Sequence, residues 1–399
     1  MNILSPTKKE ALCQGFADAF GCQPERFFSA PGRTELSGNH TDHQHGMVLA
    51  AAVDLDVLAA VRENGTDEIR ILSQGYPLCR VSLRELTPKA EETNTTAALI
   101  RGVAARFAEL SCSVRGFDAY MESTVLPGSG LSSSAAFEVL VGTVINCLFF
   151  DSKATAPEIA IIGQYAENVF FGKPSGLMDQ MASSVGGMVF IDFADPKNPV
   201  IESVDFDFSA CGHALCIIDT RSGHADLTDE YAAIPTELKQ ICAHFGKSVL
   251  REVDEGAFYS ALPALRQSCG DRAVLRAIHF FRENARVPLQ AEALGRGDFE
   301  SYLQLMKESG YSSWMYLQNV IPAGRKKDQA VALSLALCQQ YLAGRGGFRV
   351  HGGGFAGTVQ AFVPFDLLDS FRTGIENTLG VGACHVLSIR QAGGVELTL

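Results

Sequence analysis

Apolar and polar positions follow two different spacings along the chain, which predict a mixture of helices and strands. In the first half, the spacing that gives a helix one apolar face occurs at 9–20, 95–110, 133–149 and 157–171, and β-branched, strand-like stretches occur at 47–61 and 69–83. The second half predicts helices at 225–246, 260–267, 271–285, 288–296 and 326–343, then short strands near 348–351, 357–363 and 385–390. Because helices and strands do not strictly alternate, the pattern favours an α+β fold over a doubly wound parallel sheet.

The chain is long enough for about two domains. It has 399 residues, and a loop-forming run from Ala194 to Pro199 interrupts the pattern near its middle. We therefore expect an N-terminal domain over residues 1–200 and a mostly helical C-terminal domain over residues 201–399.

Charge and cysteine content exclude several classes of protein. The net charge is −12, from 33 Lys+Arg against 45 Asp+Glu, and no dense basic run is present. A nucleic-acid-binding surface or an anionic-membrane surface is therefore not expected. The 11 Cys include no C-x-x-C pair, and the sequence has neither a signal-peptide core nor the roughly 18-residue apolar run that a membrane span needs. We expect a cytoplasmic protein with free thiols; the composition is compatible with a monomer.

A Gly/Ser-rich segment, LPGSGLSSSAAFEV at 126–139, could hold a phosphate. Gly128 and Gly130 allow the backbone to approach a ligand closely, and Ser132–Ser134 lead directly into a predicted helix. The start of a helix offers unpaired N–H groups and the positive end of its dipole. The segment lacks the Gly-Lys-Ser/Thr ending of a Walker A loop. The alternative is a turn followed by a serine-capped helix.

A second segment, PGRTELSGNHTDHQHG at 31–46, is unusually dense in polar side chains. They are Arg33, Glu35, Asn39, His40, Asp42, His43 and His45. Such a set suits a sugar, whose hydroxyls need paired donors and acceptors, although a histidine metal site and a solvated loop are alternatives. Period-two alternation would place His43 and His45 on one face and His40 on the other, which disfavours the metal site.

Two carboxylates between residues 166 and 187 are candidates for chemistry. Asp179 lies in a mostly apolar, glycine-bounded stretch, where it could be a buried base or an ordinary helix-terminus residue. Glu167 lies on the polar side of the preceding helix and could complete a Mg²⁺ shell with a serine and phosphate oxygens.

A fourth segment, FRVHGGGFAGTVQAFV at 348–363, formally contains G-x-G-x-x-G through Gly352, Gly354 and Gly357. The residues that follow it, 358–363, predict a strand where a dinucleotide-binding motif needs a helix. A tight glycine turn beside a ligand remains open.

In this order, the four segments resemble those of the GHMP kinases, specifically the galactokinase branch. Residues 31–46 resemble the signature G-R-x-N-L-I-G-E-H-T-D-Y-N-G-G, and residues 126–136 match the phosphate loop P-x-G-x-G-L-S-S-S-A-A. Residues 172–180 are similar to G-x-x-C-G-I-M-D-Q, and residues 352–357 to G-G-G-F-G-G. A weaker likeness at Leu275–Leu294 includes His279, Glu283, Asn284 and Arg286. The resemblance spans residues 12–363, most of the chain.

The resemblance implies a two-domain kinase with its active site in the cleft between the domains. It would use ATP and Mg²⁺ to phosphorylate the anomeric C1 hydroxyl of galactose, with Asp179 as catalytic carboxylate and Arg33 as its cationic partner. The implied sugar contacts are Asn39, His40, Asp42, Gly176 and Tyr231. The implied phosphate-binding residues are Gly128, Ser129, Gly130, Leu131, Ser132, Ser133, Ser134 and Ala135. The implied Mg²⁺ ligands are Glu167 and a serine, Ser132 or Ser134.

The sequence departs from the family pattern mainly in the sugar-binding elements. Asn39 stands where the signature has Glu, Glu35 stands where it has Asn, and Gly310 stands where Ser-His is expected. These departures keep open a kinase of the same fold acting on another hexose or an amino sugar, and a catalytically inactive regulator that binds sugar and nucleotide. A metal-dependent hydrolase built on the histidine-rich segment is a third alternative. From the sequence alone, Asn39→Glu is expected to keep the fold and to alter the KM for the sugar.

Overall fold

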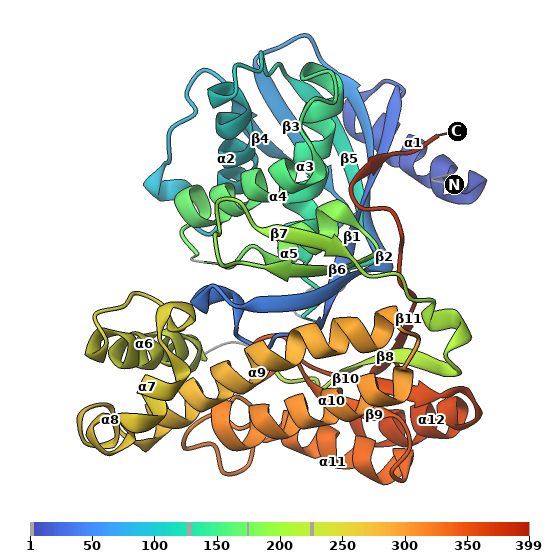
Figure 1. Cartoon of the computed structure of the whole chain (residues 1–399). Helices are drawn as coiled ribbons and strands as arrows, with labels where there is room; N and C mark the ends of the chain where they lie inside the picture. The colour runs from blue at the N-terminus through green and yellow to red at the C-terminus, as the bar shows by residue number, and fades with distance from the viewer. Residues whose placement is uncertain (1–3, 126–129, 174, 224–226, 399) are drawn as a thin grey trace.

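The computed structural model describes residues 4–125, 130–173, 175–223 and 227–398, and they form two sheets with their covering helices (Figure 1). The larger sheet has the strand order β12-β1-β2-β5-β3-β4, and β6 and β7 extend it from β2. Its strands are β1 (Arg26–Ser37), β2 (Met47–Glu63), β3 (Glu68–Ser73), β4 (Cys79–Ser82), β5 (Phe117–Ser123), β6 (Met188–Asp192), β7 (Val200–Ser203) and β12 (Val395–Glu396). All its neighbours pair antiparallel except β3 and β5.

The alternation of side chains along β2 separates two packed layers. Val57, Ala59 and Val61 belong to the main core, which also contains apolar residues of the helices α2 (Thr96–Glu109), α3 (Ser133–Phe149) and α4 (Ala156–Tyr165). Leu58 and Ala60 point to the other face and pack with Leu12 and Phe16 of α1 (Pro6–Phe20). A further helix, α5 (Met178–Val185), packs against β1 and β2.

The smaller sheet is antiparallel, with the order β11-β8-β10-β9. Its strands are β8 (His213–Asp219), β9 (Gly347–His351), β10 (Thr358–Pro364) and β11 (Cys384–Leu387). The helices of this half are α6 (Thr228–His244), α7 (Glu255–Ser260), α8 (Leu262–Cys269), α9 (Asp271–Gly295), α10 (Phe299–Ser312), α11 (Ala330–Leu342) and α12 (Leu368–Leu379). Residues of α11 and α12 pack on β8–β10, whereas α9 lies between the two halves and contacts β1 and β2 (Figure 1). After β11 the chain returns to the first sheet, where β12 pairs with β1.

The predicted elements are largely confirmed, with three corrections. Residues 271–296 were expected as two helices, but α9 runs unbroken through Pro288. The missing N–H of proline costs a hydrogen bond, and the buried Glu283, Val287 and Gln290 around it hold the helix together. The predicted helix at 157–171 ends as α4 and continues as a π-helical turn, η3 (Ala166–Phe171). The stretch expected as strand at 69–83 is divided into β3 and β4, and the sequence did not predict the strands β1, β5, β6, β7, β8 and β12 or the helices α5, α7, α10 and α12.

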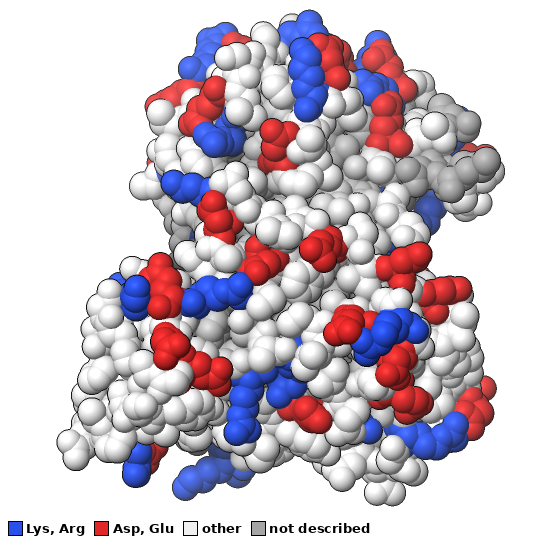
Figure 2. All heavy atoms as spheres, in the orientation of Figure 1, with Lys and Arg blue, Asp and Glu red and all other residues white. Residues whose placement is uncertain are grey.

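Two surface properties bear on the excluded classes. On the face drawn in Figure 2, basic and acidic side chains are interspersed, and Lys and Arg do not gather into a continuous patch. Among the described residues, no helix is long and apolar enough to cross a membrane.

Candidate active site

Arg33 and Asp179 form an ion pair where β1 meets the first turn of α5. Arg33 Nε lies 2.8 Å from Asp179 Oδ1, and Nη2 lies 2.8 Å from Oδ2, so the contact is bidentate. Arg33 is 7% exposed and Asp179 is 31% exposed, so one side of the carboxylate stays accessible. Burial alone would raise the pKa of Asp179, but the charge and hydrogen bonds of Arg33, helped by a hydrogen bond from Ser132, lower it. Asp179 is therefore an ionised carboxylate with a fixed orientation.

The described part of the predicted phosphate segment lies directly beside this pair. The Arg33 N–H donates to Leu131 O at 3.0 Å, and Arg33 Nη1 donates to Gly130 O. Ser132 adopts a left-handed conformation with φ 57° before α3 begins at Ser133, and its side chain makes no capping hydrogen bond. Ser132 therefore does not cap α3 through its side chain, and its hydroxyl does not satisfy the N–H groups of the first turn. Two residues of the predicted phosphate set, Gly128 and Ser129, lie outside the described residues.

A cavity of about 760 Å³ opens at the start of α3. Ser133 and Ser134 line one part of it, and apolar side chains of β2, β3, β5 and α2 line the rest, among them Val57, Ile71 and Leu99. The sequence did not predict this cavity, because strand residues that line a cavity have the same apolar pattern as residues that fill a core. Its size is suited to a nucleotide-sized ligand.

Glu167 is the centre of a buried polar cluster next to Ser134. Its Oε1 lies 3.5 Å from Ser134 Oγ and 2.9 Å from Lys173 Nζ, and its Oε2 accepts from Gln180 Nε2 at 2.9 Å. Burial, and then the charge of Glu167, raise the pKa of the neighbouring Glu138 well above its usual value. A serine hydroxyl and a carboxylate are the hard oxygen donors that Mg²⁺ prefers, so Ser134 and Glu167 fit a Mg²⁺ site. The other predicted serine, Ser132, instead hydrogen bonds to Asp179.

Asp42 and Gly176 lie against each other near Asp179. A Cβ atom added at Gly176 would lie 1.7 Å from Asp42 Oδ2, so only glycine leaves room for that carboxylate. Asp42 Oδ1 accepts the N–H of His43 at 2.8 Å. Burial, with a smaller contribution from the charge of Asp179, raises the pKa of Asp42 to about 6. The site thus holds two carboxylates, of which Asp179 ionises more readily.

The glycine turn after β9 holds two further predicted residues. His40 Nε2 lies 2.9 Å from Gly353 O, and the Tyr231 hydroxyl donates to Gly354 O at 2.6 Å. Gly352 and Gly354 have φ values of 65° and 77°, a conformation that glycine adopts readily. The turn therefore joins β9, α6 and the segment after β1 at one place.

The expected alternation of the histidines is wrong. Residues Asp42–Gln44 form a 3₁₀ turn, so the period of an extended strand does not apply, and His40 Nδ1 lies 3.2 Å from His43 Nε2. Burial lowers the pKa of both side chains, that of His43 to about 3, so this pair is neutral. Within the described part of the chain, no group of three or more His, Cys, Asp or Glu is arranged to hold a metal.

Asn39 is fully buried, and protein groups occupy its side chain. Its Nδ2 donates to Gly352 O at 2.6 Å and to Glu35 Oε1 at 3.2 Å, while its Oδ1 accepts from Ser313 and Asn319. The same Glu35 Oε1 accepts from Arg349 Nη2 at 2.8 Å. Glu35 and Asn39 are therefore in direct contact. At these two positions the family signature has Asn and Glu, the same two residue types in the opposite order.

Several residues that hold the site were not identified as such from the sequence. Glu283 on α9 accepts the N–H groups of Gly38 and Asn39 at 3.2 and 3.4 Å, and Asn284 Oδ1 accepts the N–H of Met47 at 2.8 Å. The weak family likeness at 275–294 contained both residues without indicating their role. Arg349 could have been noticed as a lone charge on a predicted strand.

Comparisons with known proteins identify the family and the fold. A model of the galactokinase galactose-binding signature matches residues 14–63, and a model of the GHMP kinases N terminal domain matches residues 98–187. The structure is similar to that of Lactococcus lactis galactokinase complexed with galactose, with a TM-score of 0.82, 24% identity, and 97% of this chain and 99% of that chain covered. It is also similar to Methanococcus jannaschii mevalonate kinase, with a TM-score of 0.64, 14% identity and coverage of 92% and 98%.

A relative by sequence is galactokinase from Streptomyces coelicolor, which is 31% identical over 384 residues, 94% of each chain. This likeness extends through both sheets and includes the segments that meet at Arg33 and Asp179. The chain therefore belongs to the galactokinase family.

Proposed function

We propose that the protein transfers the γ-phosphoryl group of MgATP to the C1 hydroxyl of galactose. The observation that carries the proposal is the position of the Arg33–Asp179 pair. Arg33 hydrogen bonds to Gly130 and Leu131, just before the start of α3, and Asp179 lies near enough to Asp42 to affect its pKa. A phosphate donor on α3 and a sugar beside Asp42 would thus meet at the Asp179 carboxylate.

Asp179 is suited to act on the hydroxyl that attacks. An ionised carboxylate can accept the hydrogen bond of the C1 hydroxyl and orient its oxygen toward the γ-phosphorus. As the oxygen–phosphorus bond forms, the bond to ADP breaks and the hydroxyl proton leaves, and Asp179 is the base in place to receive it. Arg33 keeps this carboxylate ionised and adds positive charge where the phosphoryl group carries negative charge.

The 760 Å³ cavity supports binding of the nucleotide base. Its apolar walls suit a purine ring, and Ser133 and Ser134 at its edge bring the phosphates to the helix N–H groups. Ser134 and Glu167 would hold Mg²⁺, with Ser132 as the other predicted ligand. Bound Mg²⁺ would neutralise charge on the phosphate oxygens.

We propose His40, Asp42, Gly176 and Tyr231 as the sugar-binding set. The exposed side of Asp42 and the turn at 352–354 support it, because they offer acceptors for hydroxyl groups within one small region. The proposed role of Asn39 is indirect, since its buried Nδ2 already donates two hydrogen bonds and its Oδ1 already accepts two.

We also propose a domain boundary near residue 200, with residues 1–200 and 201–399 as the two domains. Strands β1 to β7 all belong to the larger sheet, and β7 ends at Ser203. The first strand of the smaller sheet, β8, begins at His213, which supports this boundary. The short β12, which follows the strands of the smaller sheet, pairs with β1 of the larger sheet and so connects the two domains.

A sugar screen tests the proposed substrate. ADP formation is measured with galactose, galactosamine, N-acetylgalactosamine, glucose, mannose and fucose, and phosphorus NMR identifies the phosphorylated carbon. We expect galactose to give the highest kcat/KM and a C1 phosphate as product. A higher kcat/KM for an amino sugar or another hexose would indicate that this sugar, and not galactose, is the substrate. Binding of ATP and sugar without ADP formation would favour the regulator.

A further inference from the structure

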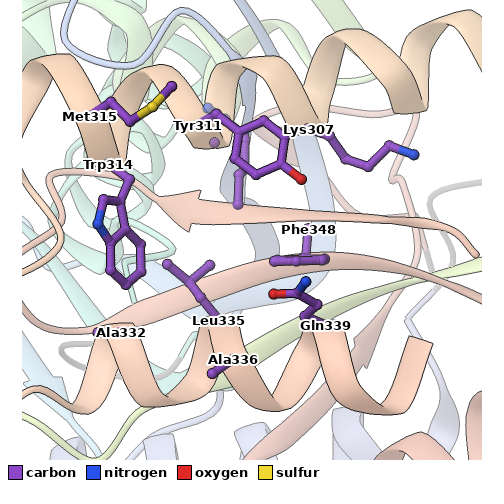
Figure 3. A pocket seen from close by; sticks show the side chains of 11 residues that line it. Lys307, Tyr311, Trp314, Met315, Ala332, Leu335, Ala336, Gln339 and Phe348 are labelled. Atoms are coloured by element: carbon purple, nitrogen blue, oxygen red, sulfur yellow. The ribbon is translucent and has the colours of Figure 1, made fainter. Parts of the chain in front are cut away.

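A second cavity, of about 310 Å³, lies between α10, α11 and β9 and includes no residue of the proposed ATP and sugar sites (Figure 3). Its walls are mainly apolar: Trp314 from the π-helical turn η6 (Ser313–Leu317), Leu335 from α11 and Phe348 from β9. Trp314 is 43% exposed and Tyr311 is 57% exposed. Large aromatic side chains thus remain open to solvent around a concave site, where a ligand could cover them.

The polar side chains of this cavity gather at one end. In Figure 3 the Tyr311 hydroxyl and Gln339 lie near Phe348, and the Lys307 side chain extends beyond them, away from Trp314. Among the described residues, the Lys307 ammonium, the Tyr311 hydroxyl and the Gln339 amide make no hydrogen bond or ion pair. The cavity therefore offers an apolar pocket together with a cation and two neutral polar groups.

Gly310 and Arg349 form the floor of the cavity. A Cβ atom added at Gly310 would lie 3.1 Å from Arg349 Cβ and 3.2 Å from Phe348 O, so glycine allows α10 to approach β9 this closely. Gly310 is also a position where the sequence departs from the family pattern, which has a larger side chain. The Arg349 guanidinium is turned away, toward Glu35 at 2.8 Å, so Lys307 is the cation available to a ligand.

We propose that this cavity binds a small carboxylate with a compact apolar body. The volume is at the lower end of the range for small-molecule sites, and the aromatic and aliphatic walls suit an apolar body of about ten carbons. The free ammonium of Lys307 at one end suits a single anionic group, by a charge-assisted hydrogen bond. This site is distinct from the proposed kinase site, and its occupancy does not depend on the kinase reaction.

The single Trp of the chain is Trp314, so its fluorescence reports this cavity directly. The probe is 1-adamantanecarboxylate, which has a compact apolar body and does not absorb with tryptophan; 1-adamantylamine has the same shape and the opposite charge. We expect a saturable change with a Kd of about 1 mM or below for the carboxylate, and at least about tenfold weaker binding of the amine.

Three variants locate the probe. Lys307→Met is expected to weaken carboxylate binding about fivefold or more, and Ala336→Phe, on the exposed rim, to abolish it by filling the cavity. Lys326→Met, an exposed lysine outside the cavity, is the matched control and is expected to change nothing. Circular dichroism and the kinase assay verify that each variant is folded.

Several results would overturn the proposal. They are the absence of saturation, equal binding of the amine, unchanged binding by Lys307→Met, or competition of the probe with galactose or ATP, which would place it in the kinase site. Analytical ultracentrifugation tests a further alternative. If the chain forms a dimer in solution in which a second copy covers Trp314, the cavity is an interface between copies and not a small-molecule site.

Discussion

The contact between Glu35 and Asn39 predicts that the two positions can be exchanged together but not singly. Glu35 Oε1 lies 3.2 Å from Asn39 Nδ2 and 2.8 Å from Arg349 Nη2, and Arg349 and Glu35 are only 0% and 3% exposed. One buried positive charge is thus matched by one carboxylate at this point. The family signature has Asn and Glu at these positions, which is the same pair in reverse.

Each single substitution breaks this balance. Glu35→Asn leaves Arg349 buried without its carboxylate, which costs about 3–5 kcal/mol. Asn39→Glu places a second buried carboxylate beside Glu35, and two like charges at about 4 Å repel by about 4 kcal/mol at an effective dielectric constant of about 20, unless one takes up a proton. From the sequence alone we expected Asn39→Glu to keep the fold. Because Asn39 is buried beside Glu35, we now expect this substitution to destabilise the protein.

The double variant Glu35→Asn/Asn39→Glu restores one carboxylate and one amide. We expect it to lose only about 1–2 kcal/mol, so the coupling energy between the two sites is about 5 kcal/mol or more when both carboxylates of Asn39→Glu stay ionised. Urea unfolding of the four proteins without ligand measures it, with the midpoints converted through a common slope. A double variant as unstable as the sum of the single variants, or an Asn39→Glu protein as stable as the wild type, would refute this reasoning.

Three further predictions concern the sugar and metal sites. Gly176→Ala forces the Asp42 carboxylate to move by more than about 1 Å and is expected to lower kcat/KM for galactose about 100-fold. The neutral control is Gly295→Ala, whose added Cβ meets nothing within 4 Å. Equal kinetics of the two variants would show that Asp42 is not part of the sugar site. Because the folded-state pKa of Asp42 is raised to about 6, kcat/KM for galactose should rise as the pH increases through 6. The free energy of unfolding of the free enzyme should fall as the pH rises from 4 to 6, because over this range the folded state binds a proton that the unfolded state does not. If Asp42→Asn showed the same rise in kcat/KM near pH 6, the assignment to Asp42 would be contradicted. Glu167→Gln should raise the Mg²⁺ concentration for half-maximal activity about tenfold or more. This is measured by Mg²⁺ titration, with Glu202→Gln, at an exposed position, as the control. An unchanged half-maximal Mg²⁺ concentration would exclude Glu167 as a ligand.

The sequence predicts helices such as α2 and α3 well because their apolar faces repeat over three or more turns. It does not predict that β1 extends through Arg33 and Glu35, because charged residues break the local strand pattern. Their burial depends on Asp179 and Arg349, which lie 146 and 314 residues further along the chain. No local pattern contains that pairing.

The candidate site divides in the same way. The motifs identify Arg33, Asp42 and Asp179, and the fold brings them together. The motifs do not indicate that Asn39 is occupied by protein groups, since this depends on Ser313, Asn319 and the turn at 352–354. Motif spacing thus indicates which residues carry chemistry, and the long-range contacts decide which of them face the ligand.

The central claim is that Asp179 is the carboxylate at which sugar and ATP meet. Its most direct test is the kcat of Asp179→Asn with saturating galactose and MgATP, accompanied by the binding affinities of both substrates. Asparagine keeps the size of the side chain and one oxygen that can accept from Arg33, but it loses the second acceptor of the bidentate contact, cannot take a proton and carries no charge. The account predicts that kcat falls by about 1,000-fold or more while both substrates still bind. A kcat within about tenfold of the wild type would contradict it.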